Sequence, residues 1–236
     1  MTGPDERQDE VHQHSGWLIP LGFLLVIVVL SGLFLLYDLR PGPGPRGGRS
    51  ADAVPVQLTV RGLQLTVPAN YLDGSDRSDG ERDTLILSAL LPDLRGYSPE
   101  DAHLFIGNAP DSPVVRLLFK GDENDLDAAA RLERIYRPYI QAPNGTPSDF
   151  GLTLYAFRAN SGYARQDLFA GMAGGKLVLF LCERTSTDLP SPNCLMTRKS
   201  VARNLSFSYR FKRAYLARWR EIAGGMDGLL ARLLAK

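Results

Sequence analysis

The hydrophobic pattern of the chain is dominated by one uncharged apolar run near its start, WLIPLGFLLVIVVLSGLFLLY, from Trp17 to Tyr37. At a rise of 1.5 Å per helical residue, this run reaches about 30 Å, the thickness of the hydrocarbon core of a bilayer. A helix also satisfies its own backbone hydrogen bonds, as a spanning segment must. The pattern therefore predicts a single transmembrane helix over residues 17–37, in contact with the lipid bilayer.

A cleaved signal peptide and a buried core helix explain this run less well. A signal peptide has a basic start, an apolar stretch of about 7–15 residues and small residues directly after it. Here the start, MTGPDERQDE, is acidic apart from Arg7, and Asp38 follows the run. Trp17 and Tyr37 close its two ends, as amphipathic rings do at the headgroup level of a membrane. We therefore expect an uncleaved span.

A segment rich in proline and glycine, RPGPGPRGGRS, follows the apolar run from Arg40 to Ser50. Glycine and proline disfavour helices, and proline cannot donate to a sheet ladder. This composition predicts a spacer over residues 38–54. The expected organisation is a short tail over 1–16, the span over 17–37, the spacer, and one domain over 55–236.

The clearest alternation of apolar and polar positions opens this domain. VQLTV at residues 56–60 and LQLTV at residues 63–67 flank the dipeptide Arg61-Gly62. Gly62 can take the positive φ that two-residue hairpin loops require. The pattern predicts a β-hairpin whose apolar side chains cover a core.

Beyond the hairpin, the pattern predicts more strands than helices. The expected strands cover residues 84–91, 114–119, 152–157, 165–169, 176–182 and 205–211. The expected helices cover residues 98–105, 124–137, 213–223 and 226–235, the last two separated by Gly224 and Gly225. Because the strands come in runs rather than in alternation with helices, the predicted fold class is α+β, with a mainly antiparallel sheet and two to four helices.

Composition narrows the classes of protein that fit. The formal net charge is +1 and the hydrophobic content is 44%. These values exclude a disordered chain and a surface built to coat nucleic acid, so we expect no nucleic-acid partner. The sequence does not predict an oligomeric state.

The two cysteines of the chain, Cys182 and Cys194, flank the turn-rich stretch ERTSTDLPSPN. A loop joining two strands can bring them within disulfide distance, so we predict a bond between them and an oxidising compartment. The alternative is two unrelated buried thiols. A metal site is disfavoured, because two cysteines without a neighbouring histidine leave half of a tetrahedral shell empty.

Two signals in the sequence disagree about the orientation of the predicted span. Arg40, Arg46 and Arg49 after the run outnumber Arg7 before it, which favours a cytoplasmic domain. The predicted disulfide favours the outside, and long domains translocate largely regardless of flanking charge. We expect a bacterial inner-membrane protein with a periplasmic domain.

No catalytic motif is present. The sequence contains no HExxH, GxSxG or EF-hand pattern, and His103 is the only histidine beyond the predicted span. The stretch GMAGGK at residues 171–176 resembles a phosphate loop only superficially, since Leu177 stands where serine or threonine would bind magnesium. Between two predicted strands it indicates a hairpin turn. We expect no catalytic residues and no cofactor.

Several carboxylates gather in one acidic loop, where a calcium ion would be a conceivable ligand. Its carboxylates are Asp73, Asp76, Asp79, Glu81 and Asp83. Because basic residues alternate with them and the spacing is not that of an EF-hand, we expect no metal there.

The C-terminal segment interleaves basic and aromatic residues. Its predicted partner-binding members are Arg213, Tyr215, Arg218, Trp219 and Arg220. The alternative is a half-buried strand and an amphipathic helix whose arginines keep their charged ends in water. In either case Arg213 and Arg220 are expected at the surface, nearly neutral for folding.

Together, one span, one spacer and no catalytic set predict a domain that acts by binding, as an accessory or subunit of an envelope assembly. One alternative is an envelope enzyme that acts on cell-wall or lipid substrates with carboxylates such as Glu81 and Asp83. Another is an immunity-type or ligand-sensing domain. No residue motif fixes a family.

Overall fold

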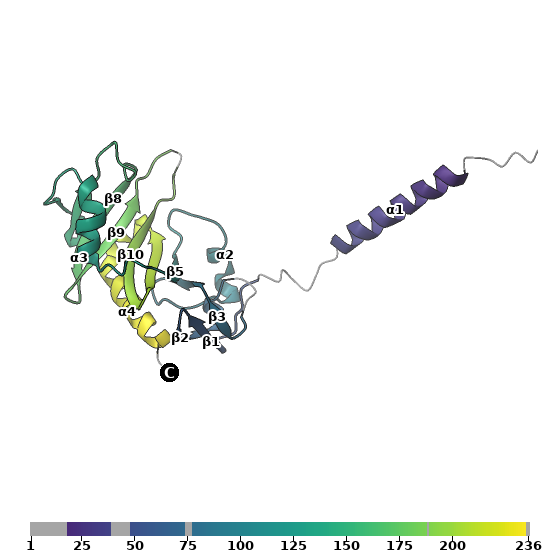
Figure 1. The fold of residues 1–236 in the computed structure, drawn as a ribbon, viewed down its shortest axis with the longest axis horizontal. Coiled ribbons are helices and arrows are strands. Elements are labelled where there is room, and N and C mark those ends of the chain that lie inside the picture. The colour runs from purple at the N-terminus through teal and green to yellow at the C-terminus, as the bar shows by residue number, and fades with distance from the viewer. Residues whose placement is uncertain (1–17, 39–47, 74–76, 188, 235–236) are drawn as a thin grey trace, which may run out of the picture. The chain divides into compact units, whose positions relative to one another are not determined.

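The computed structural model describes residues 18–38, 48–73, 77–187 and 189–234. The chain divides into two compact units, Met1–Pro45 and Arg46–Lys236, and Figure 1 follows the chain through its elements. The predicted tail over 1–16, residues 39–47 of the predicted spacer, and Asp76 lie outside the described residues.

The first unit contains one helix, α1, at Leu18–Asp38. The predicted helical structure is therefore confirmed, and the apolar side chains from Leu21 to Phe34 are exposed. Among the described residues, however, no helix is long and apolar enough to cross a membrane. The predicted span is not supported.

The second unit opens with a small sheet in the order β2-β1-β3. Strands β1 (Pro55–Val60) and β2 (Leu63–Pro68) form the predicted hairpin, with Val60 opposite Leu63. Arg61 and Gly62 both have positive φ, at 48° and 83°, as a type I′ turn requires. Strand β3 (Gly80–Arg82), within the predicted acidic loop, pairs parallel to β1.

The main sheet has eight strands in the order β4-β5-β11-β10-β9-β8-β7-β6, and every neighbouring pair is antiparallel. Its strands are β4 (Thr84–Leu90), β5 (Val114–Gly121), β6 (Thr146–Ser148), β7 (Leu152–Ala156), β8 (Gln166–Ala173), β9 (Lys176–Glu183), β10 (Asn193–Ala202) and β11 (Leu205–Lys212). The turn predicted in GMAGGK is confirmed, because Gly174 and Gly175 connect β8 to β9 in a two-residue loop with Ala173 opposite Lys176.

The helices of this unit are short except for the last. They are α2 (Ala102–Phe105), α3 (Ala128–Arg131) and α4 (Trp219–Leu234). A π-helical turn, η3 (Leu132–Tyr136), continues α3, and 3-10 turns occupy Ala69–Tyr71, Pro99–Asp101, Arg137–Tyr139, Asp149–Gly151 and Arg213–Arg218. The predicted α+β fold with a mainly antiparallel sheet is confirmed.

Alternate residues of the main sheet enter two separate apolar clusters, so both faces of the sheet are covered in part. Phe180 and Tyr209 belong to a cluster that includes Trp219 and Met226 of α4 and the buried face of β1 and β2. Leu168 and Leu179, which point to the other face, pack in a cluster with residues of η3. Figure 1 shows α4 in yellow and α3 in teal beside the sheet. The core thus depends on the period-two pattern of the strands.

The predicted disulfide is confirmed. Cys182 and Cys194 are bonded, and they lie directly opposite each other on β9 and β10. Both are fully buried. The bond closes the loop between these two strands, as the sequence predicts.

Three predicted elements differ from the structure. The stretch between the cysteines is predicted to join two strands, but no bounds are predicted for the second, which is β10 at Asn193–Ala202. The helix expected from residue 124 starts only at Ala128, where the Asp127 carboxylate caps it by accepting a hydrogen bond from the amide of Ala130. The two helices expected at the C-terminus are instead a 3-10 turn and one continuous helix through Gly224 and Gly225.

Candidate binding site between β9 and β10

The main sheet opens between two of its central strands. Strands β9 and β10 pair over only three positions, from Cys182 opposite Cys194 to Phe180 opposite Met196. Beyond these positions β9 stays paired with β8 on its other side and β10 with β11, but the described residues of the two strands no longer pair with each other. Two strand edges therefore face each other across a gap.

A bulge in β10 explains why the strands separate. Met196 lies opposite Tyr209 of β11, and the next paired residue, Lys199, lies opposite Phe207. Three steps along β10 thus match two steps along β11, which places one extra residue in β10. Bulged strands bend and twist more strongly. The bend carries β10 away from β9.

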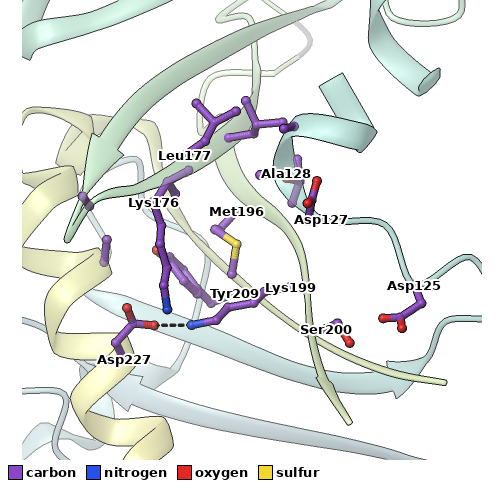
Figure 2. Close-up of a pocket in the computed structure, with 16 residues that line it drawn as sticks. Asp125, Asp127, Ala128, Lys176, Leu177, Met196, Lys199, Ser200, Tyr209 and Asp227 are labelled. Atoms are coloured by element: carbon purple, nitrogen blue, oxygen red, sulfur yellow. Dashed lines mark hydrogen bonds and ion pairs between the residues drawn. The ribbon is translucent and has the colours of Figure 1, made fainter. Parts of the chain in front are cut away.

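A cavity of about 480 Å³ fills this gap. Figure 2 shows it between the start of β9, the end of β10, the beginning of α3 and one turn of α4. Its lining is mainly apolar, and includes Leu177, Val178, Leu179, Met196 and Ala128. A volume of this size is typical of a small-molecule site or a few residues of an extended peptide.

Charged side chains mark two parts of the rim. Lys199 of β10 donates to Asp227 of α4 at 2.8 Å, and Lys176 at the start of β9 lines the same part of the cavity. Asp125 and Asp127, which precede α3, also line it. The rim thus carries opposite charges around an apolar floor, an arrangement that fixes the orientation of a bound ligand.

Two hydroxyl groups lie in the wall of the cavity. The hydroxyl of Thr197 is buried and has no hydrogen-bond partner among the described residues. Burial raises the pKa of Tyr209 far above its ordinary value, and Asp227 adds to this effect, so its phenol stays protonated at physiological pH. A buried hydroxyl without a partner costs about 1–3 kcal/mol. A ligand that bonded to Thr197 would recover this cost.

The residues considered for chemistry are not gathered here. Glu81 and Asp83 are exposed in and next to β3, and His103 is exposed in α2. Within residues 18–38, 48–73, 77–187 and 189–234, no group of three or more His, Cys, Asp or Glu could hold a metal ion. Asp73 is engaged by Arg49 and Arg116. The lining of the cavity offers binding contacts rather than a nucleophile next to a base.

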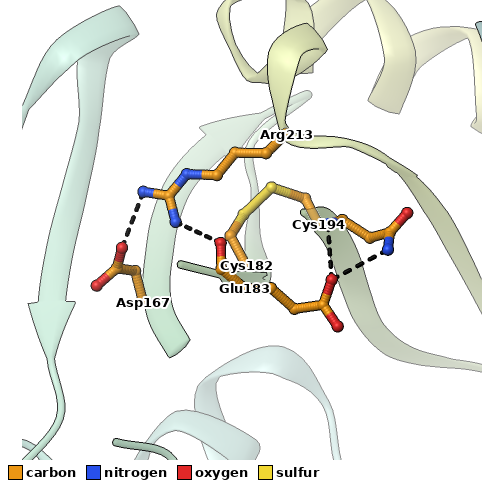
Figure 3. The surroundings of a disulfide bond; sticks show 6 residues. Asp167, Cys182, Glu183, Cys194 and Arg213 are labelled. Atoms are coloured by element: carbon orange, nitrogen blue, oxygen red, sulfur yellow. Dashed lines mark hydrogen bonds and ion pairs between the residues drawn. A yellow bond between two sulfur atoms is a disulfide. The ribbon is translucent and has the colours of Figure 1, made fainter. Parts of the chain in front are cut away.

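The predicted partner-binding residues are mostly engaged within the domain. Figure 3 shows Arg213 beside the disulfide, where it donates to Asp167 at 2.8 Å and to the carbonyl of Glu183 at 2.7 Å. Trp219 is fully buried, and its indole donates to the carbonyl of Phe150 at 3.0 Å. Arg213 therefore helps to hold β8, β9 and the C-terminal segment together.

The other three members lie closer to the surface. Their contacts are Tyr215 to the carbonyl of Asp111, Arg218 to Glu221, and Arg220 to the carbonyl of Phe150. Arg220 also stacks over the Trp219 ring at 4.4 Å. The partner role of this segment stays a prediction.

Sequence reasoning missed the cavity because it missed β10. Met196, Thr197 and Lys199 were not placed on any element, and the stretch NCLMTRKSVA has no regular alternation that would mark a strand. The predicted strands over 176–182 and 205–211 do place Lys176, Leu177, Val178, Leu179 and Tyr209 of the lining on β9 and β11.

No family model and no curated protein matches this chain. Among solved structures it is similar to Smlt3025, an immunity protein of the Stenotrophomonas maltophilia type IV secretion system, with a TM-score of 0.54 and 17% identity over 77% of this chain and 94% of that chain. A second similar structure is the Neisseria meningitidis iron-regulated outer membrane lipoprotein FrpD, with a TM-score of 0.46 and 11% identity over 79% of this chain and 94% of that chain. The likeness to Smlt3025 is one of fold.

Proposed function

We propose that this chain is an immunity-type binding protein of the bacterial envelope, and that a protein partner inserts an extended segment into the gap between β9 and β10. The observation that carries the proposal is the gap itself, where two strand edges flank an apolar cavity that is also lined by Thr197, a residue with a buried, unpartnered hydroxyl. An open strand edge binds an extended peptide through main-chain hydrogen bonds, while pockets beside it select side chains.

The size and chemistry of the cavity support a peptide segment over a purely apolar ligand. A peptide brings backbone donors and acceptors, which strand edges and hydroxyls can satisfy, whereas a hydrocarbon ligand would leave them unpaired. The rim charges at Lys176, Asp125 and Asp127 suit a segment that carries charge on both sides of an apolar centre.

The immunity class is supported by the likeness in fold to Smlt3025, which extends over 94% of that chain. An immunity protein acts by binding and needs no catalytic residues. The disulfide supports a location outside the cytoplasm, because such bonds persist in oxidising compartments. An accessory subunit of an envelope assembly is the wider class to which the same geometry belongs.

We further propose that α1 and the proline-rich spacer tether the domain to the inner membrane, with the domain on the periplasmic side. The apolar run of α1 and the disulfide support this arrangement. A reporter that is active only in the periplasm, fused after Lys236, is expected to be active. Activity of a reporter that works only in the cytoplasm would reverse the topology.

Site-specific photo-crosslinking in intact cells tests the binding site. A photoreactive residue at Lys199, whose side chain is 40% exposed at the cavity rim, is expected to give one defined protein adduct. The control position is Ile86 on β4, which is similarly exposed at 46% and lies outside the cavity. Equal adducts from both positions would contradict a partner in the gap.

A growth assay then tests the immunity role. The crosslinked protein, expressed without this chain, is expected to arrest growth, and coexpression of the full chain should restore it. Ala129→Arg, which places a large side chain in the cavity wall, should abolish the rescue, whereas Ala130→Arg on the adjacent residue outside the lining should not. A captured partner that is harmless to cells would reject the immunity role and leave a binding role.

A further inference from the structure

A second cavity, of about 340 Å³, lies beside the strands β5 and β11. Its lining is mainly polar and includes Arg116, Arg210 and Lys212, together with the amides Asn108 and Asn193. Among the described residues, no Asp or Glu lines it. The cavity therefore gathers three positive charges without a carboxylate in its wall.

The two arginines face each other directly. Arg210 of β11 is the cross-strand partner of Arg116 of β5, and like charges in directly opposite positions destabilise a sheet. Arg116 lies 3.6 Å from Asp73, a carboxylate that Arg49 also engages. Within the described residues Arg210 has no ion pair. Asp73 thus compensates only part of the positive charge on Arg116 and Arg210.

Lys212 adds a buried charge at the end of the same row. Its ammonium donates to the Oγ of Ser191 at 2.6 Å, to the carbonyl of Ser191 at 3.3 Å and to Asn108. None of these acceptors is charged, and no carboxylate forms an ion pair with Lys212 in the described part of the chain. Burial and the neighbouring Arg210 lower the pKa of Lys212, and Glu183 offsets part of this effect. Such a charge is costly to bury without a counterion.

We propose that this cavity is a binding site for a phosphate group. Arginine guanidinium groups match phosphate oxygens in two-pronged geometry, and a dianion compensates two of the three charges where a carboxylate would compensate one. In the wall, the oxygen of the Asn108 amide accepts from Lys212 and the Asn193 amide donates one hydrogen bond to Glu183 at 3.0 Å, which leaves N–H donors on both amides for a ligand. This site is separate from the gap between β9 and β10, since the two share no lining residue.

The phosphate can come from a soluble molecule or from a lipid headgroup. The cavity lies near the start of the domain, because Arg49 stacks over the ring of Phe105, which lines the cavity, at 4.5 Å. The lipid source rests on the membrane tether proposed above, whereas the soluble source does not.

The test uses the full chain in nanodiscs of phosphatidylcholine, titrated with inorganic phosphate by calorimetry. We expect saturable binding that acetate and chloride at matched ionic strength do not reproduce. Arg210→Gln and, separately, Arg116→Gln should weaken binding about tenfold or more. Lys120→Gln removes a positive charge from an exposed position of β5 outside the cavity and should leave binding unchanged.

Nanodiscs that also contain phosphatidic acid distinguish the two sources. A lower apparent affinity for inorganic phosphate in these discs would assign the site to a lipid headgroup, and an unchanged affinity would assign it to a soluble phosphate compound. Absence of saturable binding in phosphatidylcholine discs, equal binding of acetate, or an equal loss in Lys120→Gln would overturn the proposal. None of these outcomes depends on the partner proposed for the other cavity.

Discussion

Cys182 and Cys194 are a directly opposed pair on β9 and β10, and the pairing of these strands ends two residues further along β10, where Met196 lies opposite Phe180. The disulfide therefore lies at the closed end of the gap that forms the candidate site. A contact of three residue pairs gives two strands little resistance to separation. The covalent bond fixes the point from which the strands diverge, and so helps to fix the width of the gap.

Reduction of this disulfide is expected to lower the free energy of unfolding by about 3 kcal/mol, the chain-entropy value for a loop of this size. Urea unfolding of the full chain, with and without reductant, measures the effect. The double variant Cys182→Ala/Cys194→Ala serves as the control, because reductant should not change its stability. If mass spectrometry shows two free thiols in protein from intact cells, both the bond and the argument for an oxidising compartment fail.

Gly171 and Trp219 form a contact that leaves no room for a side chain. A Cβ added at Gly171 would lie 2.6 Å from two ring atoms of Trp219, and Trp219 is fully buried against Phe180, with ring centroids 5.9 Å apart. Gly171→Ala should therefore cost about 1–3 kcal/mol. The smaller ring in Trp219→Phe removes the obstruction, so the double variant should cost less than the sum of the single variants. Additive costs in urea unfolding would show that the two residues do not interact.

Arg213 and Arg218 should differ in their contribution to folding, although both come from the same basic segment. Arg213 makes two charge-assisted hydrogen bonds, to Asp167 and to the carbonyl of Glu183, and its side chain is 26% exposed. Arg213→Gln should cost about 1.5–3 kcal/mol. Arg218 pairs with Glu221 at the surface, where both side chains are largely exposed, so Arg218→Gln should change stability by less than about 0.5 kcal/mol.

Equal costs for these two variants would support the sequence-based expectation that Arg213 is a surface charge. If Arg213→Gln costs more stability than Arg218→Gln, Arg213 is unsuitable as a probe of partner binding, because its replacement disturbs the fold. Arg218 would then be the better residue for testing the partner role predicted for the C-terminal segment.

Elements whose signal is local could be predicted from the sequence. The hairpin at Arg61-Gly62 and the turn at Gly174-Gly175 are set by dipeptides that tolerate positive φ between alternating strands. The C-terminal helix could not be predicted in full, because its continuation through Gly224 and Gly225 depends on a tertiary contact. A Cβ at Gly225 would lie 2.9 Å from the side chain of Leu94, so glycine permits α4 to approach that residue.

The candidate sites depended on information that is not local. Strand β10 carries polar residues and a bulge, so its sequence lacks the alternation of a strand, and it is held in place by β11 and the disulfide. The phosphate site likewise unites Arg116 with Arg210 and Lys212, which are distant in sequence and meet only because β5 pairs with β11. The strands that carry most lining residues could be predicted, and so could the pairing of the cysteines, which are near in sequence on either side of a turn.

Thr197 is the residue at which stability and binding should change in opposite directions. Its hydroxyl is buried and has no hydrogen-bond partner among the described residues. Folding therefore removes this hydroxyl from water without a hydrogen bond to replace the one it made there. Thr197→Val keeps the shape of the side chain and removes this hydroxyl. The free energy of unfolding should therefore stay the same or rise, by up to about 1 kcal/mol. Urea unfolding of the full chain measures this part of the prediction.

The same variant should weaken binding of the partner. If the inserted segment bonds to the Thr197 hydroxyl, its loss should reduce the yield of the Lys199 crosslink and lower the affinity by about tenfold, since a bonded group of the partner would be left unpaired. Thr153→Val on β7, outside the cavity, is the matched control and should change neither crosslink nor affinity. A stable Thr197→Val protein that binds its partner as tightly as the parent chain would exclude this hydroxyl from the interface, and with it the main polar contact on which the proposed site rests.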